Sequence, residues 1–219
     1  MLVLGIDEAG RGPVLGSMFI AGALIDENHD HALRSDGVKD SKLVTPANRT
    51  RLAKKIRKIA KEIHFVEITA REIDEKRKVM SLNELEALKV AELIEMFKKK
   101  PEKIIIDAPD PDASNFTRRI KKYTSLKDMQ VVSEHKADVH YAPVSAASII
   151  AKTERDKSIR ALERKHKVKL GTGYSHDARA IAFLEECSKR DSWPDFVRHS
   201  WNTSRRVKDA KFQKKIFEF

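Results

Sequence analysis

The sequence has few of the features that cross-link a chain or anchor it in a membrane. Cys187 is the only cysteine among 219 residues, which excludes an internal disulfide and a cysteine-based zinc site. No window approaches the roughly 18 consecutive apolar residues of a transmembrane helix. The first apolar run has no basic leader and passes directly into acidic residues, so we expect no signal peptide. These absences predict a cytoplasmic protein in a reducing compartment.

Charged residues, in contrast, are abundant. They make up 35% of the chain, and 44 Lys and Arg against 33 Asp and Glu give a formal net charge of +11. This balance favours a polyanionic partner such as nucleic acid. A solvated surface rich in Lys and Glu, as in many thermophile proteins, has a similar composition. Charge alone therefore favours nucleic acid only modestly.

Apolar runs and helical periodicities alternate along the chain. We expect strands at residues 2–6, 17–25, 64–69, 103–106 and 129–133, and helices after Thr45 and Ser81, at 112–123, from Pro143 to about residue 167, and beyond residue 176. Strands that come first at close spacing and then alternate with helices predict an α/β fold. We expect a mixed five-stranded sheet flanked by helices, with a C-terminal helical region.

The runs 2–6 and 103–106 are apolar throughout, which predicts central, parallel strands. Each run is followed by an aspartate, so Asp7 and Asp107 should meet at the carboxyl edge of the sheet, where open α/β sheets place their sites. Glu8 follows Asp7 directly. Asp138 precedes a helix whose first turns are small and apolar, and close docking of that helix would bring Asp138 over the same edge.

Carboxylates without a His or Cys cluster indicate Mg²⁺ or Mn²⁺ rather than zinc. Four acids around two such ions suit in-line displacement at phosphorus, in which one ion activates water and the other stabilises the leaving oxygen. The segment Gly10-Arg11-Gly12-Pro13 follows the first two acids and leaves backbone N–H groups open to a phosphate, with Arg11 nearby. The sequence therefore indicates phosphodiester chemistry.

Several separate motifs, in this order along the chain, resemble those of ribonuclease HII, most closely the single-chain archaeal type. They are Asp7-Glu8-Ala9-Gly10-Arg11-Gly12-Pro13, Asp40-Ser41-Lys42-Leu43, Lys136-Ala137-Asp138, the run from Val144 to Lys152, Gly171-Thr172-Gly173-Tyr174 and Arg198-His199-Ser200-Trp201. The resemblance covers nearly the whole chain. It implies a ribonuclease H-like fold and a metal-dependent endoribonuclease that cuts RNA–DNA hybrids and single ribonucleotides in duplex DNA. Cleavage would fall 5′ to the ribonucleotide and leave 3′-hydroxyl and 5′-phosphate ends.

The resemblance also implies roles for individual residues. Its four metal-binding catalytic acids match Asp7, Glu8, Asp107 and Asp138, the segment that senses the ribose 2′-hydroxyl matches Gly10, Arg11 and Gly12, the tyrosine that packs on the next deoxyribose matches Tyr174, and the phosphate contacts match Ser41, Lys42 and Ser145. The 2′-hydroxyl is the group that distinguishes RNA from DNA. Three of these residues have a plainer interpretation: Tyr174 as a buried loop aromatic, Lys42 as a solvated turn residue and Ser145 as a helix-terminus hydrogen bond.

Two positions depart from the family pattern. Ser175-His176 follows the tyrosine where the family usually has proline, and Ser17 stands where proline is common. The first departure would loosen the loop that carries Tyr174 and weaken the preference for a ribonucleotide–DNA junction.

The C-terminal residues resemble the peptide that docks on sliding clamps of the PCNA type. Gln213, Ile216 and Phe219 match its anchors, whereas a terminal amphipathic helix packing on its own domain is the alternative. The expected organisation is a ribonuclease H-like catalytic domain at 1–170, a helical substrate-binding region at 171–212 and a clamp-binding tail at 213–219. We expect a monomer.

Three other interpretations have distinct signatures. Ribonuclease HIII usually carries an N-terminal substrate-binding domain, for which a strand that begins at residue 2 leaves no room. A non-catalytic nucleic-acid-binding module would have lost at least one acid, and all four are present. A recombination-type nuclease on the same fold would lack the combination of Gly-Arg-Gly and Tyr174.

Overall fold

The computed structural model describes residues 1–38, 44–125 and 129–217, with side chains up to residue 210. The chain forms two compact units. The first comprises Met1–Ala9, Phe19–Glu67 and Ser81–Glu154, and the second comprises Gly10–Met18, Ile68–Met80 and Arg155–Phe219. The domain borders expected after residues 170 and 212 stay a prediction.

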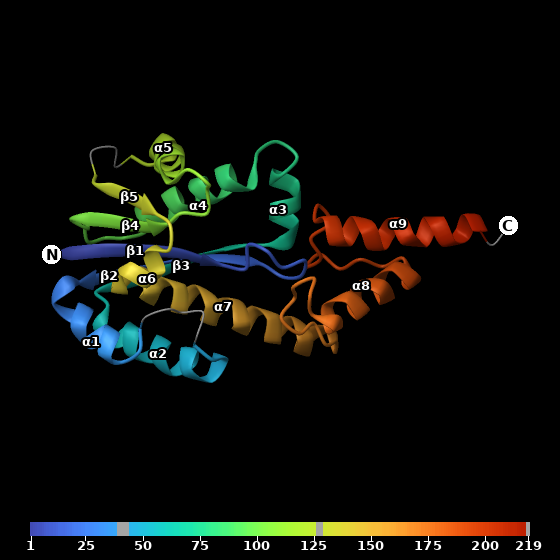
Figure 1. Cartoon of the computed structure of the whole chain (residues 1–219), viewed down its shortest axis with the longest axis horizontal. Helices are drawn as coiled ribbons and strands as arrows, with labels where there is room; N and C mark the ends of the chain where they lie inside the picture. Colours follow the sequence, from blue (N-terminus) through green and yellow to red (C-terminus); the bar gives the residue numbers. More distant parts are fainter. Residues whose placement is uncertain (39–43, 126–128, 218–219) are drawn as a thin grey trace. The chain divides into compact units, whose positions relative to one another are not determined.

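The first unit is built on a mixed five-stranded sheet in the order β3-β2-β1-β4-β5 (Figure 1). Its strands are β1 (Leu2–Ala9), β2 (Met18–Asp26), β3 (Glu62–Ile68), β4 (Lys103–Asp107) and β5 (Val131–Glu134). β1 runs antiparallel to β2, and β4 runs parallel to both β1 and β5. The predicted mixed sheet, with the two fully apolar strands as parallel neighbours, is confirmed.

β1 is longer than the apolar run that predicted it. The pairing of β1 with β4 is described as far as Ile6↔Ile106, but β2 continues beside β1 to the pair Ala9↔Phe19. The predicted end at residue 6 is wrong because the backbone ladder continues after the side chains become acidic. As a result, Asp7 lies within a strand that is held by hydrogen bonds to β2.

Helices cover both faces of this sheet. Figure 1 shows α4 (Leu82–Glu95) and α5 (Ala113–Tyr123) on one face, and α1 (Asp30–Ser35), α2 (Pro46–Ile59) and the first half of α7 (Ala142–His166) on the other. The short helices η1 (Glu27–His29) and α6 (Ala137–His140) complete the unit. The predicted starts of three helices are confirmed, since the side chains of Thr45, Ser81 and Asp112 cap them and accept hydrogen bonds from backbone N–H groups in their first turns.

The close approach of α7 to β1 depends on small residues. A Cβ atom at Gly5 would overlap the backbone carbonyl of Pro143 at the start of the helix. Ala142, Ala146 and Ala147 are buried in the core that α7 shares with β2 and α2. This docking sets the position of the chain just before α7, which carries Asp138.

The second unit is mainly helical. It contains residues 10–18, α3 (Ala70–Lys76), the second half of α7, α8 (Ala178–Arg190) and α9 (Asn202–Phe217). Its core includes Leu15, Leu184 and Val197, and a backbone bridge pairs Leu15 with Val197. Burial raises the pKa of the Cys187 thiol in this unit, which favours its protonated form. Within the described ranges, no helix is both long and apolar enough to cross a membrane.

Candidate active site

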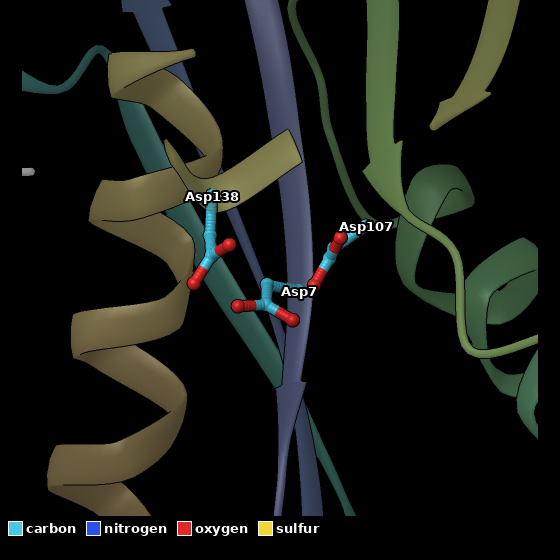
Figure 2. A group of neighbouring side chains, drawn as sticks. All are labelled: Asp7, Asp107 and Asp138. Atoms are coloured by element: carbon cyan, nitrogen blue, oxygen red, sulfur yellow. The ribbon is translucent and has the colours of Figure 1, made fainter. Parts of the chain in front are cut away.

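Three carboxylates meet at one edge of the sheet (Figure 2). Asp7 comes from β1, Asp107 is the last residue of β4, and Asp138 lies in α6. Each offers an oxygen atom, and these three oxygens all lie within 4.8 Å of one another. Asp7 is 5% exposed and Asp138 is 1% exposed. The predicted meeting of the three aspartates at the sheet edge is confirmed.

Asp107 also holds the segment that carries Asp138. The backbone N–H of Ala137 donates a hydrogen bond of 3.0 Å to Asp107 Oδ1. Just before it, Lys136 adopts a left-handed backbone conformation with φ of 58°, which turns the chain from β5 into α6. One carboxylate of the triad therefore positions another.

The environment of Asp7 disfavours its negative charge. Burial raises the pKa of Asp7 well above its ordinary value, and the neighbouring charges of Glu8 and Asp107 raise it further. A hydrogen bond from the side chain of Ser148 and the positive charge of Lys152 act in the opposite direction. Burial and the two neighbouring acids therefore both favour binding of a positive charge beside Asp7.

Ser148 and Lys152 act on Asp7, and sequence reasoning did not single them out. Both lie on α7, and their separation of four residues places them on one face of the helix. They belong to the Val144–Lys152 motif, but the sequence does not show which face of α7 meets β1. Polar residues four apart, near the start of a helix whose first turns are mostly small and apolar and which follows an acidic candidate, were the available signal.

Glu8, the fourth predicted acid, is not part of the triad. Its backbone N–H donates a hydrogen bond of 2.7 Å to Asp7 Oδ1, and its charge contributes to the raised pKa of Asp7. Its side chain lines a small cavity together with Asp7, Asp107 and Glu86 of α4. The role of Glu8 as a metal ligand stays a prediction.

The triad fits a divalent metal ion. It offers carboxylate oxygens alone, which suit hard cations such as Mg²⁺ and Mn²⁺. A cation bound here would offset the mutual repulsion that raises the pKa of Asp7. Two of the three carboxylates, those of Asp7 and Asp138, are buried on a strand and a docked helix, which restricts their geometry before any ion binds.

In the second unit, the glycine-rich segment and the predicted sugar-packing tyrosine lie together. Gly10 has a φ of +90°, and a Cβ atom at Gly12 would lie 3.2 Å from Cε1 of Tyr174. The Arg155 guanidinium lies 5.2 Å from the centre of the half-buried Tyr174 ring. The structure therefore brings two of the predicted recognition elements into one place.

Comparisons with known proteins identify the family. A family model described as Ribonuclease HII matches residues 4–204. The chain belongs to the ribonuclease HII family. A ribonuclease HII of Methanothrix thermoacetophila is 43% identical over 209 residues, which cover 95% of this chain and 98% of the relative. Ribonuclease HII is a type 2 ribonuclease H, so the chain is an endonuclease that hydrolyses phosphodiester bonds.

Solved structures of relatives agree with the fold. The crystal structure of the ribonuclease H2 from Pyrococcus horikoshii OT3 matches with a TM-score of 0.89 and 41% identity, covering 97% of this chain and all of that one. A chain from the structure of the PCNA:RNase HII complex of Archaeoglobus fulgidus matches with a TM-score of 0.83 and 36% identity, covering 92% and 96%. The expected ribonuclease H-like architecture is confirmed.

The tyrosine loop departs from the family pattern at Ser175-His176, yet hydrogen bonds hold it. The backbone N–H and the hydroxyl of Thr172 donate to Asp177 Oδ2 at 2.8 and 2.9 Å. Arg155 donates to the carbonyl of Thr172. The exposed ring of His176 stacks on Tyr174, with 5.2 Å between the ring centres. The effect of this departure on substrate preference stays a prediction.

The remaining predicted site residues are not assigned a role by the structure. Ser145 is 1% exposed, and its backbone N–H donates to the carbonyl of Tyr141 at 3.0 Å, so its contact with phosphate stays a prediction. Ser41 and Lys42 lie outside the described residues. The side chains of Gln213 and Ile216, and all of Phe219, also lie outside them.

Proposed function

We propose that this ribonuclease HII hydrolyses the RNA strand of RNA–DNA hybrids and also cuts duplex DNA on the 5′ side of a single embedded ribonucleotide. The products would carry 3′-hydroxyl and 5′-phosphate ends. The triad of buried Asp7 and Asp138 with half-buried Asp107 supports this proposal most directly, because its carboxylate oxygens suit a divalent metal ion in a family of type 2 ribonucleases H. The net charge of +11 suits a polyanionic substrate.

The triad, with Glu8 as a fourth ligand, would hold Mg²⁺ or Mn²⁺, with two ions bound during catalysis. Such ions supply an activated water and charge neutralisation at the leaving oxygen. Ser148 and Lys152 favour the ionised form of Asp7, the form that binds a metal ion, because both lower its pKa against the effect of burial. Asp107 keeps Asp138 in place through its bond to Ala137.

Substrate choice would depend on the second unit. The backbone of Gly10, Arg11 and Gly12 would contact the ribose 2′-hydroxyl, a group that both donates and accepts hydrogen bonds. The ring of Tyr174 would pack on the sugar of the next deoxynucleotide. The closeness of Gly12 to the Tyr174 ring, which a Cβ atom at Gly12 would approach to 3.2 Å, supports this pairing, since the two elements could then read adjacent sugars. Ser41, Lys42 and Ser145 would contact phosphates.

The products test this proposal directly. A labelled DNA duplex with one ribonucleotide, incubated with Mg²⁺ or Mn²⁺, should give a single cut 5′ to the ribonucleotide. A DNA polymerase should extend the upstream fragment, because that fragment ends in a 3′-hydroxyl. An all-DNA duplex of the same sequence should stay intact. A cut 3′ to the ribonucleotide, or an upstream end that cannot be extended, would overturn the proposed specificity.

A sliding clamp is the proposed protein partner. The Archaeoglobus fulgidus ribonuclease HII forms a complex with PCNA, and Gln213, Ile216 and Phe219 of this chain are spaced like the anchors of a clamp-binding peptide. Gel filtration of this protein with a PCNA-type clamp should show co-elution that is lost when residues 213–219 are deleted. Co-elution that survives the deletion would overturn the role of the tail.

A further inference from the structure

Arg198 is a fully buried cation in the second unit, 0% exposed. Its guanidinium donates to three backbone carbonyls: Nη2 to Gly10 at 2.6 Å, Nη1 to Arg11 at 3.0 Å and Nε to Gly16 at 2.9 Å. A buried charge is costly unless it is fully hydrogen-bonded. The fork of the guanidinium is therefore matched to the curved backbone of residues 10–16.

Trp201 adds a fourth bond to the same segment. Its indole Nε1–H donates to the carbonyl of Gly12 at 3.1 Å, and its ring lies 4.8 Å from the Arg198 guanidinium carbon. The carbonyls of three successive residues, from Gly10 to Gly12, thus point toward Arg198 and Trp201. The motif Arg198-His199-Ser200-Trp201 acts as one clamp on this backbone.

Fixing a carbonyl also fixes the next N–H, because a trans peptide unit is planar and its C=O and N–H point in opposite directions. The bond to the Gly10 carbonyl turns the N–H of Arg11 away from Arg198, and the bond to the Arg11 carbonyl does the same for Gly12. Pro13, which follows, has no N–H. The clamp therefore presents two adjacent N–H donors on the face opposite Arg198, an arrangement that suits an oxygen acceptor.

The clamp is itself held in place. The carboxylate of Asp74, on α3, accepts hydrogen bonds from the backbone N–H groups of His199 and Ser200 at 2.7 and 2.9 Å. The N–H of Arg198 donates to the carbonyl of Val14 at 2.9 Å. These bonds restrain the segment 198–201 from both sides, so the geometry that it imposes on residues 10–12 is rigid.

We propose that Arg198 and Trp201 are positioning residues for ribose recognition, which aim the N–H groups of Arg11 and Gly12 at the 2′-hydroxyl oxygen. This inference rests on the proposed function, in which residues 10–12 contact the ribose. It predicts that weakening the clamp lowers discrimination between ribonucleotide and deoxyribonucleotide without weakening contact with the rest of the duplex.

The test is a ratio of dissociation constants, measured by fluorescence anisotropy with Ca²⁺ in place of a catalytic ion. The two probes are a DNA duplex with one ribonucleotide and the all-DNA duplex of the same sequence. Trp201→Phe retains an aromatic ring and removes the indole N–H donor, so the preference for the ribonucleotide should fall by about threefold to tenfold. Arg198→Lys should lower it further, because an ammonium cannot span three carbonyls. Affinity for the all-DNA duplex should change less than twofold.

Trp193→Phe is the matched control, because it makes the same chemical change at the other tryptophan and should leave the ratio at the wild-type value. A ratio measured on one preparation does not depend on the fraction of folded protein. A wild-type ratio in Trp201→Phe overturns the inference, whether or not Arg198→Lys folds. If the wild-type enzyme binds both duplexes equally, the proposed contact with the 2′-hydroxyl is wrong. The inference about Arg198 and Trp201 then fails as well, because it rests on that contact.

Discussion

At the scale of single residues, the environment of Asp7 favours a bound cation and lowers the stability of the metal-free protein. Its carboxyl group is 5% exposed and lies beside other acids, so burial and the charges of Glu8 and Asp107 raise its pKa. Ser148 and Lys152 offset this effect only in part. The free energy of unfolding therefore contains an unfavourable contribution from Asp7 at neutral pH, which bound metal would remove.

Replacement of Asp7 should stabilise the metal-free protein. A carboxyl group whose pKa is raised by folding contributes stability below its unfolded pKa, and this contribution is lost as the pH rises through the folded pKa. Asp7→Asn has no charge at this position, so the variant does not lose stability as the pH rises. In EDTA at pH 8 its melting temperature should therefore exceed that of the wild type by about 2–4 °C. The difference should shrink toward pH 4. Asp30→Asn, on α1, is the control, and a lower melting temperature for Asp7→Asn would contradict this account.

Metal binding should reverse that order. A ligand that binds only the folded state raises its stability with concentration. Addition of Mg²⁺ or Mn²⁺ should raise the melting temperature of the wild type and should have a smaller effect on Asp7→Asn. Differential scanning fluorimetry across a metal titration measures both. An equal shift in the two proteins would mean that the ions bind elsewhere.

At the scale of elements, the docking of α7 on β1 places Asp138, Ser148 and Lys152 around Asp7. Gly5 makes this approach possible, since a Cβ atom there would overlap the backbone of Pro143. Gly22 of β2 is less restrictive, because its Cβ would lie 2.9 Å from the end of the Phe97 ring, which can rotate away. Substitution of Gly5 would therefore clash with backbone atoms, whereas substitution of Gly22 would clash with a side chain.

Gly5→Ala should separate α7 from the sheet. Because the contacting atoms belong to the backbone, we expect a loss of about 3 kcal/mol in the free energy of unfolding, against about 1 kcal/mol for Gly22→Ala. Urea unfolding followed by circular dichroism measures both. Gly5→Ala should also weaken Mg²⁺ binding, because Asp138 would move away from Asp7. Equal losses for the two variants would show that the approach of α7 is not the limiting contact.

Local signals in the sequence predicted the elements well. The N-caps at Thr45, Ser81 and Asp112 were predictable because each cap depends on residues within one helical turn. Asp7 and Asp107 were predictable as neighbours because parallel apolar strands end at the same edge. The extension of β1 to Ala9 was not, because it depends on pairing with β2. The proposed roles of Ser148, Lys152 and Arg198 were also missed, since each arises from long-range packing that periodicity does not encode.

At the scale of the whole molecule, net charge should control affinity. With 44 basic and 33 acidic residues, the chain should bind duplex mainly through phosphates and release counterions. We expect the logarithm of the association constant to fall with the logarithm of salt concentration, with a slope of about −3 to −6. Fluorescence anisotropy with an all-DNA duplex measures this slope over about a sixfold range of salt, roughly 50 to 300 mM KCl. An affinity independent of salt would contradict an electrostatic interface.

The first unit carries the acidic triad, and the second carries the proposed ribose-recognition elements, so chemistry and recognition should be separable by substitution. Variants in the triad should abolish cleavage and keep binding. Variants of Arg198 or Trp201 should still cleave the preferred substrate at a measurable rate. Their preference for a ribonucleotide over a deoxyribonucleotide should be lower than that of the wild type. The triad is the centre of this account, and Asp138 is its most informative member because only the docking of α6 and α7 brings it to the sheet edge.

The decisive measurement is therefore cleavage of a duplex with one ribonucleotide by Asp138→Asn, beside the wild type and Asp30→Asn, with Mg²⁺ or Mn²⁺. Binding of the same duplex in Ca²⁺ is measured in parallel. The account predicts that the wild type and Asp30→Asn cut 5′ to the ribonucleotide, whereas Asp138→Asn binds the duplex and cuts it at least about a thousandfold more slowly, since loss of a metal ligand removes several kcal/mol of transition-state stabilisation. Cleavage by Asp138→Asn at the wild-type rate would contradict it.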